Sequence, residues 1–276
     1  MNYRRRRRIS GWACNALLAV FLVITFYPFF WLLTTSLKQQ VDAFSIPPTW
    51  IFVPTLENFA GVLEPVFLKS YWNNLVVSSL CTFVSLLLGI PASYSLVRSR
   101  FRGKAFMGTW ILLTRMVPRV VFVIPLYLLF RNLGLIDTYT GLVIAYLTIT
   151  LPFVIWILTG FFQGVPQELE EAAMIDGCSR VGTLLRVVLP LSTPGLATAA
   201  IFSLMMSWNQ FFYPIILGGR DTMTAPAVVA SMVSFEGPNW GHMAAAGLLV
   251  VGPVLIFTFL AQGGLVRGLL GGALKR

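Results

Sequence analysis

Two arginines inside an apolar stretch are the ionised side chains of this sequence best placed to act on a solute. Arg115 and Arg119 are four residues apart, so a helix places both on one face. An arginine deep in a membrane costs about 2.5–3.5 kcal/mol, so it should face the protein interior, a partner or water. We predict that both lie along a translocation path, where they bond solute hydroxyl groups or shape a gate. The alternatives are bonds to carbonyl groups freed near Pro118 and Pro125, or contact with a partner subunit.

A second polar group, Trp208-Asn209-Gln210, stands within another apolar stretch. Amide side chains without partners are costly there, so an interior or partner-facing position is expected. Substrate contact along the same path and packing in the interior both remain open for this cluster.

Catalytic and metal-binding constellations are missing from the sequence. It has no Gly-x-x-x-x-Gly-Lys-Ser/Thr loop, so the chain is not expected to hydrolyse ATP itself. The single histidine, His242, is expected to be an interfacial residue. All 10 carboxylates fall outside the apolar stretches, which disfavours proton-coupled transport. We predict no catalytic residue, no metal site and no cofactor.

The polar passage over residues 163–194 contains signals for two helices. Pro166 suits the first turn of a helix, and Glu168 lies near its positive end. Gly177 can adopt the left-handed conformation that ends a helix, and Ser179 can cap a second helix. Pro190 marks the approximate end of that second helix. The sequence therefore predicts a helix, a sharp turn and another helix.

Each of these two helices has a predicted face. In the first helix, a small and mildly apolar face recurs at helical spacing in Leu169, Ala172, Ala173 and Asp176. In the second, the predicted apolar stripe consists of Val181, Leu184, Leu185 and Val188. Because alanines let a foreign surface approach closely, we predict that this loop is a docking element.

Long apolar helices must position these residues. The chain has 276 residues, of which 57% are apolar and 11% charged, and its mean hydropathy of +0.80 indicates an integral membrane protein. About 20 apolar residues cross a bilayer core as a helix, and the stretches lack the alternation of barrel strands. Six such stretches are predicted, at residues 12–34, 74–97, 105–130, 140–162, 195–217 and 243–266. The predicted fold is an all-α bundle of six transmembrane helices in one domain, 12–276, after a basic segment, 1–11.

Clusters of basic residues set the predicted orientation. Arginines precede the first stretch at positions 4–8, basic residues follow the second at 98–104, and the sequence ends on Lys275-Arg276. By the positive-inside rule, both termini and the 163–194 loop are cytoplasmic. Topology and anionic lipid account for the net charge of +10, so nucleic-acid binding is not expected. The first stretch is too long for a secretory signal, and the 3 cysteines show no disulfide spacing.

The 163–194 loop carries the motif of a known family. Glu171-Ala172-Ala173, three residues, Gly177, nine residues and Val187-x-Leu189-Pro190 resemble the EAA loop of permease subunits of binding-protein-dependent ABC importers. Val187 replaces the usual isoleucine. By resemblance, this loop is the coupling element that docks into the cytoplasmic ATPase subunit. The residues that carry this role over are Glu171, Ala172, Ala173, Asp176, Gly177, Leu189 and Pro190.

The likeness covers nearly the whole sequence and is greatest to MalG-like permeases of the carbohydrate uptake class. Matching segments include Pro28-Phe-Phe-Trp31, Leu133-Gly134-Leu135, Ser207-Trp208-Asn209 and Val266-Arg267-Gly268. Gln210 departs from the pattern, since that group more often has an acid there.

This resemblance implies alternating access powered from outside the chain. A second homologous permease would complete the pathway, two ATPase subunits would bind the ATP, and an extracytoplasmic solute-binding protein, met by the outer loop 38–69, would deliver a sugar or oligosaccharide. The implied location is the cytoplasmic (inner) membrane of a prokaryote. A permease for a non-sugar solute, such as a polyol or glycerol phosphate, is the alternative. A stand-alone channel or secondary carrier would leave the ordered loop unexplained.

Overall fold

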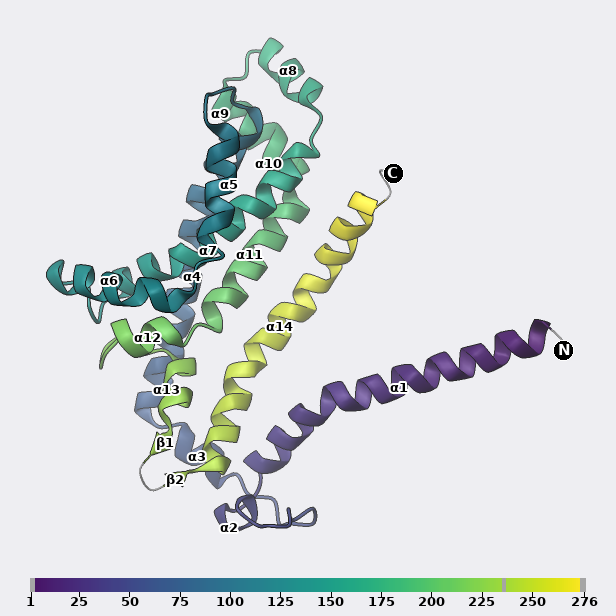
Figure 1. Cartoon of the computed structure of the whole chain (residues 1–276), viewed down its shortest axis with the longest axis vertical. Coiled ribbons are helices and arrows are strands. Elements are labelled where there is room, and N and C mark those ends of the chain that lie inside the picture. The colour runs from purple at the N-terminus through teal and green to yellow at the C-terminus, as the bar shows by residue number, and fades with distance from the viewer. Residues whose placement is uncertain (1–2, 235–236, 274–276) are drawn as a thin grey trace. The chain divides into compact units, whose positions relative to one another are not determined.

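The computed structural model describes residues 3–234 and 237–273 and is helical almost throughout (Figure 1). Its only described strands, β1 and β2, are two residues each and pair antiparallel, with Val233 opposite Pro238. The prediction of an all-α fold is confirmed. In chain order the elements are α1 Tyr3–Ser36, α2 Gln40–Ala43, α3 Glu57–Val62, α4 Pro65–Arg98, α5 Lys104–Thr114, α6 Arg119–Asn132, α7 Tyr139–Gln163, α8 Gln167–Ile175, α9 Arg180–Thr183, the π-helical segment η1 Leu184–Val188, α10 Leu189–Leu191, α11 Thr193–Trp208, α12 Phe212–Leu217, α13 Ala225–Ser231, β1 Val233–Ser234, β2 Gly237–Pro238 and α14 Trp240–Ala273.

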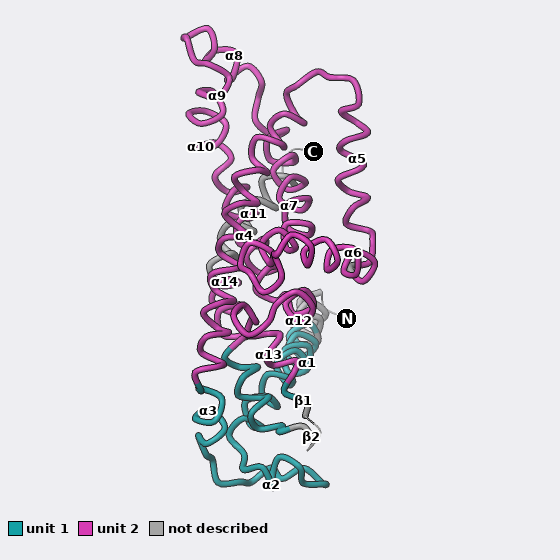
Figure 2. The backbone as a smooth tube through the Cα atoms, turned by 90° about the vertical axis from the view of Figure 1, so that its left-hand side faces the viewer, with its two compact units in different colours: residues 1–64, 232–249 teal, residues 65–231, 250–276 magenta. Residues whose placement is uncertain are grey.

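The chain divides into two compact units, coloured separately in Figure 2. The first unit comprises Met1–Glu64 and Met232–Leu249, and the second comprises Pro65–Ser231 and Val250–Arg276. Helix α14 therefore contributes to both units. Every predicted site residue belongs to the second unit.

Four described helical segments are long and apolar enough to cross a membrane, at Cys14–Ser36, Pro65–Arg98, Tyr139–Gln163 and Trp240–Phe259. A fifth span is present if Arg180–Leu191 and Thr193–Trp208, which are bent by 82°, count as one. These segments confirm a multi-pass membrane protein. Four of the six predicted stretches are thus single long helices.

The predicted single helix over 105–130 is wrong. Helix α5 ends at Thr114 and α6 begins at Arg119, with Pro118 between them. Proline has no N–H to donate and disfavours helical geometry at the residue before it, so the helix cannot run through this point. The predicted stretch 195–217 is also divided, into α11 and α12. There Pro214 falls in the first turn of α12, where its missing N–H removes no helical bond.

Helices α4 and α7 form the most extensive helix pair of the second unit, and α11 packs against both. Gly89 of α4 allows the close approach, because a Cβ atom there would lie 2.6 Å from Val154 Cγ1 of α7. Thr150 Oγ1 lies 2.6 Å from Ser85 Oγ and 3.2 Å from Cys81 Sγ across the same interface. Small and hydroxyl-bearing residues are typical of helix contacts in membranes, where they permit close packing.

The first unit is organised around the end of α1. Asn58 Nδ2 of α3 donates hydrogen bonds to the carbonyl oxygens of Ser36 at 2.9 Å and of Lys38 at 2.7 Å. The buried Lys38 ammonium lies 5.3 Å from the ring centroids of both Trp31 and Phe52, a cation–π arrangement. It lines a cavity of about 250 Å³ together with Trp240.

Candidate functional site

The predicted helix–turn–helix is present. Helix α8 ends in a Schellman arrangement, in which the N–H of Gly177 bonds the carbonyl of Met174 at 3.1 Å and the N–H of Cys178 bonds that of Ala173 at 2.9 Å. Gly177 has a φ of 91°, which glycine adopts without steric cost. The predicted left-handed glycine joint is therefore confirmed.

The second helix begins at the predicted cap. The Ser179 side-chain oxygen accepts a hydrogen bond from the N–H of Gly182 at 3.1 Å. Helix α9 then passes directly into η1, where the N–H of Leu189 bonds the carbonyl of Leu184, and into α10, which ends at Leu191. Short π-helical segments of this kind occur often at functional sites.

Apolar side chains of this loop face outward. Ile175, just before the turn, is 86% exposed. The second helix divides into two ridges: Leu184 and Val188 pack into a core cluster, whereas Val181 and Leu185 are exposed. The predicted apolar stripe is thus buried at Leu184 and Val188 and exposed at Val181 and Leu185. The exposed large apolar side chains of α8, α9 and η1, which we call the loop face, are Leu169, Met174, Ile175, Val181 and Leu185.

The motif residues lie on this same element. Ala173 and Leu189 are half-buried, and the other five are exposed, namely Glu171, Ala172, Asp176, Gly177 and Pro190. Glu171 Oε1 accepts a hydrogen bond from Gln167 Nε2 at 3.0 Å. Most of the motif is therefore accessible, and its role in docking stays a prediction.

A buried ion pair, absent from the sequence predictions, fixes α8 to the ends of α4 and α7. Glu170 is only 2% exposed. Its carboxylate accepts hydrogen bonds from Arg98 Nε at 2.6 Å and from the Tyr94 hydroxyl at 2.8 Å. Arg98 also donates to the carbonyl oxygens of Phe162 at 3.2 Å and Val165 at 2.6 Å. The only sequence signal is that Arg98 belongs to a basic cluster and Glu170 to an acidic one.

The structure places Arg115 at the break between α5 and α6. Its guanidinium carbon lies 4.9 Å from the ring centroid of Phe153 and 5.6 Å from that of Trp156, both on α7. Arg115 nevertheless remains exposed in the isolated chain. Arg119 is the first residue of α6, and its side chain lies outside the described part of the structure. Because the helix is interrupted between them, the predicted shared helical face is wrong.

The Trp208-Asn209-Gln210 cluster is divided between interior and surface. Trp208 is 1% exposed and donates from Nε1 to the carbonyl of Val250 at 3.0 Å. Gln210 is also buried, and its carbonyl accepts from the Tyr146 hydroxyl at 3.4 Å. Asn209 is exposed and directly follows the last residue of α11. Two of these three predicted path residues are therefore interior packing residues in the isolated chain.

No metal-binding group is found in residues 3–234 and 237–273: they contain no cluster of three or more His, Cys, Asp or Glu side chains that could hold an ion. The backbone N–H of His242 bonds Asn239 Oδ1 at 3.1 Å, at the start of α14. For the chain as a whole, the absence of a cofactor stays a prediction.

Several apolar helices long enough to cross a membrane, together with a helix–turn–helix fixed to the ends of α4 and α7 by Arg98 and Glu170, define a multi-pass membrane protein. Sequence comparison identifies the family. Residues 85–270 match the family "Binding-protein-dependent transport system inner membrane component", and the chain belongs to this family. It is a permease subunit of a binding-protein-dependent importer.

Several relatives align over almost the whole chain. The inner membrane ABC transporter permease protein YcjP of Escherichia coli K12 is 35% identical, with 99% of both chains aligned. The diacetylchitobiose uptake system permease protein DasC of Streptomyces coelicolor is 33% identical, over 95% of this chain and 96% of the relative. The trehalose/maltose transport system permease protein MalG of Thermococcus litoralis is 32% identical over 92% of each.

The fold also matches a solved structure. A chain of a bacterial ABC transporter involved in import of the acidic polysaccharide alginate superposes with a TM-score of 0.80, covering 95% of this chain and 99% of that one. The two sequences are 23% identical, so this likeness shows the fold alone.

Proposed function

We propose that this chain forms half of the translocation pathway of an ATP-driven importer for a sugar or an oligosaccharide. The names of its relatives for diacetylchitobiose and for trehalose/maltose support this substrate class, because they align over more than nine-tenths of this chain. The observation that carries the proposal is the rigid loop over residues 167–191, held by the buried Arg98–Glu170 pair.

The loop face is the proposed contact with the cytoplasmic ATPase subunit. Closure of an ATPase can act on a membrane domain only through a stiff element that both share. The backbone hydrogen bonds of the turn at Gly177, the Ser179 cap and the Glu170 carboxylate each fix part of this loop, and Ile175 is exposed on it. Two ATPase subunits would bind and hydrolyse the ATP, and this chain would be the non-catalytic part.

The proposed orientation places the loop at the cytoplasmic side of a prokaryotic inner membrane. Both chain termini would then be cytoplasmic, as the basic clusters at 4–8 and 98–104 favour. The opposite ends of α4 and α7 would face outward, toward the extracytoplasmic solute-binding protein. The chain itself would contact lipid along its exposed apolar helices and would bind no nucleic acid.

Arg115 is the proposed contact with the solute. An exposed guanidinium within the membrane requires a partner or water to cover it, since lipid does so only at high cost. Stacked over Phe153 and near Trp156, it offers hydrogen-bond donors beside aromatic surface, a combination that suits the hydroxyl groups and apolar faces of a sugar. A second homologous permease would supply the other wall of this path. Arg119, Asn209 and the buried Trp208 and Gln210 remain candidates for lining or supporting it.

Purification of the tagged chain from its own host in mild detergent tests this assignment. We expect an ATPase subunit, a second permease and a solute-binding protein to copurify. After reconstitution into liposomes, ATP inside and a panel of disaccharides outside should give uptake that needs the binding protein. Uptake without ATP, or a chain that purifies alone and still transports, would contradict the proposal.

A further inference from the structure

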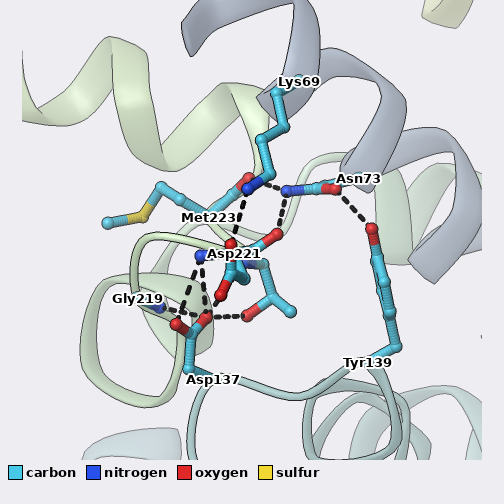
Figure 3. A network of polar contacts seen from close by, with 8 residues as sticks. Lys69, Asn73, Asp137, Tyr139, Gly219, Asp221 and Met223 are labelled. Atoms are coloured by element: carbon cyan, nitrogen blue, oxygen red, sulfur yellow. Dashed lines mark hydrogen bonds and ion pairs between the residues drawn. The ribbon is translucent and has the colours of Figure 1, made fainter.

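A single carboxylate, that of Asp137 between α6 and α7, organises the loop over residues 218–224 (Figure 3). Its Oδ1 atom accepts hydrogen bonds from the backbone N–H groups of Gly219 at 2.9 Å and Thr222 at 2.9 Å, and from the Thr222 hydroxyl at 2.8 Å. The N–H of Asp221 lies 3.2 Å from both carboxylate oxygens. Successive N–H groups that converge on one anion fix the course of the backbone, because each bond is charge-assisted.

The loop is also bonded to α4 and α7. Asn73 of α4, which is 1% exposed, donates from Nδ2 to the carbonyl oxygens of Asp221 at 2.8 Å and Met223 at 3.0 Å. Its Oδ1 atom accepts from the Tyr139 hydroxyl of α7 at 2.6 Å (Figure 3). We call these contacts of Asp137, Asn73 and Tyr139 with residues 219–223 the Asp137 cluster. Through it, the loop is attached to the third turn of α4 and to the first residue of α7.

One contact in this region is peripheral. Lys69 Nζ lies 2.7 Å from Asp221 Oδ1, but the two side chains are 49% and 73% exposed. Exposed ion pairs contribute little because water screens them. The Asp221 side chain therefore provides a matched comparison for Asp137, because it carries the same charge beside the same loop backbone but is 73% exposed.

The same two helices hold the loop over residues 167–191, the proposed coupling loop, at their other ends. Asn73 and Tyr139 lie near the starts of α4 and α7, whereas Arg98 and Phe162 lie near their ends, where Arg98 bonds Glu170 of α8. The helices thus run in the same direction. At 1.5 Å per residue, the 25 steps from Asn73 to Arg98 correspond to about 38 Å, more than the hydrocarbon core of about 30 Å.

Between these ends the α4–α7 interface has little room for sliding. Gly89 lies directly against Val154, and Thr150 bonds Ser85 in the centre of the pair. A displacement of the 218–224 loop is therefore shared with both helices at one end, and the helices hold α8 at the other end. Side-chain packing without voids transmits such displacements.

We propose that Asp137 is a positioning residue for the 218–224 loop. This loop and the coupling loop are then attached to opposite ends of one rigid α4–α7 pair. This inference rests on the proposed function. In that setting the 218–224 loop lies on the binding-protein side, and docking there alters the ATPase through α4 and α7. Asp137 touches no nucleotide and no solute in this account.

The test compares ATP hydrolysis by the complete reconstituted importer with and without its sugar-loaded binding protein. Asp137→Gly removes the carboxylate and still accepts the φ of 54° at this position. We expect it to lower binding-protein stimulation by about tenfold, a typical coupling effect, while basal hydrolysis stays unchanged. Asp137→Asn keeps one acceptor oxygen and should lose less of the binding-protein stimulation than Asp137→Gly. Asp221→Asn should resemble the wild type.

A rescue experiment separates positioning from a folding defect. In a background with Cys14, Cys81 and Cys178 replaced by serine, Asp137→Cys with Gly219→Cys should form a disulfide, because a Cβ atom at position 219 would lie 3.2 Å from Asp137 Cβ. Stimulation should return on oxidation and disappear with reductant. Full stimulation in Asp137→Gly, or no rescue by the disulfide, would overturn the inference while leaving the proposed function intact. A wild-type importer without binding-protein stimulation would overturn both.

Discussion

Glu170 and Arg98 form a buried ion pair, with Oε1 and Nε 2.6 Å apart, where helix α8 meets the end of α4. The side chains are 3% and 17% exposed, so water screens the pair far less than a surface contact. Arg98 Nη2 also donates to the carbonyl oxygens of Phe162 near the end of α7 and of Val165 just beyond it. The loop over residues 167–191, the proposed coupling loop, is therefore bonded directly to the ends of α4 and α7.

Glu170→Gln should loosen this junction. Removing one partner of a buried pair costs about 3–5 kcal/mol, and we expect about 2–3 kcal/mol because Arg98 keeps its two carbonyl acceptors. Hydrogen exchange of the α8 amides should become faster, and transport should fall. The exposed neighbour variant Glu171→Gln should leave the exchange rates of α8 unchanged. Equal protection of α8 in both variants would show that the pair does not hold the helix.

Gly177 should tolerate asparagine better than valine. Its φ of 91° costs about 1–2 kcal/mol for ordinary residues, and a Cβ atom there would meet nothing within 4 Å, so strain and not collision is the cause. Gly177→Val should insert into the membrane normally and abolish transport, whereas Gly177→Asn should retain part of it. Gly160→Ala, also in open space but helical, is the control and should transport normally. Normal uptake by Gly177→Val would remove the turn from the mechanism.

Local chemistry explains which parts of the coupling loop were predictable. Gly177 and Ser179 act on backbone groups within a few residues, so their types and spacing predicted the turn and the cap correctly. In the sequence, Glu170 is only one of three acids near the predicted helix start, with Glu168 and Glu171. Its partners Arg98 and Tyr94 are 72 and 76 residues away, and no local pattern indicates such a contact.

Among the helices, too, some features follow from local sequence and others do not. Apolar length predicted α1, α4, α7 and α14, because a bilayer sets the length of a span. The break between α5 and α6 was missed even though Pro118 was noted, because prolines within membrane helices are often accommodated as kinks. The Asp137 cluster was also missed, since the bonds of Asp137 to residues 219–222 depend on how α6, α7 and α12 come together.

The contribution of Asp137 should depend on pH. Partial burial opposes ionisation, but hydrogen bonds from Thr222, Asp221 and Gly219 outweigh it and hold the pKa of Asp137 below its ordinary value of 3.8. A lowered pKa in the folded state stabilises the fold above the ordinary value, and this stabilisation is lost as the pH falls through the folded value. Protease resistance of residues 218–224 should therefore drop in strongly acidic buffer. Asp137→Asn should show a flatter profile, and identical profiles would contradict this attribution.

Arg115 should control solute passage. Arg115→Gln removes the charge and the cation–π contact with Phe153, and we expect uptake to fall about tenfold or more with normal amounts of assembled importer. Arg115→Lys keeps the charge but not the planar donor group and should be intermediate. Arg131→Gln, exposed at the end of α6, is the control. Unchanged uptake in Arg115→Gln would remove this residue from the path.

Crosslinking from Ile175 tests the docking role of the coupling loop most directly. In the background without native cysteines, Ile175→Cys should crosslink to the ATPase subunit in the assembled importer, because Ile175 is 86% exposed on the loop face. Ile51→Cys, 95% exposed in the predicted outer loop, should not crosslink to the ATPase but should react with a membrane-impermeant maleimide from outside. The account predicts this pair of results in transport-competent membranes. A crosslink to the ATPase from position 51, or labelling of position 175 from outside, would contradict it.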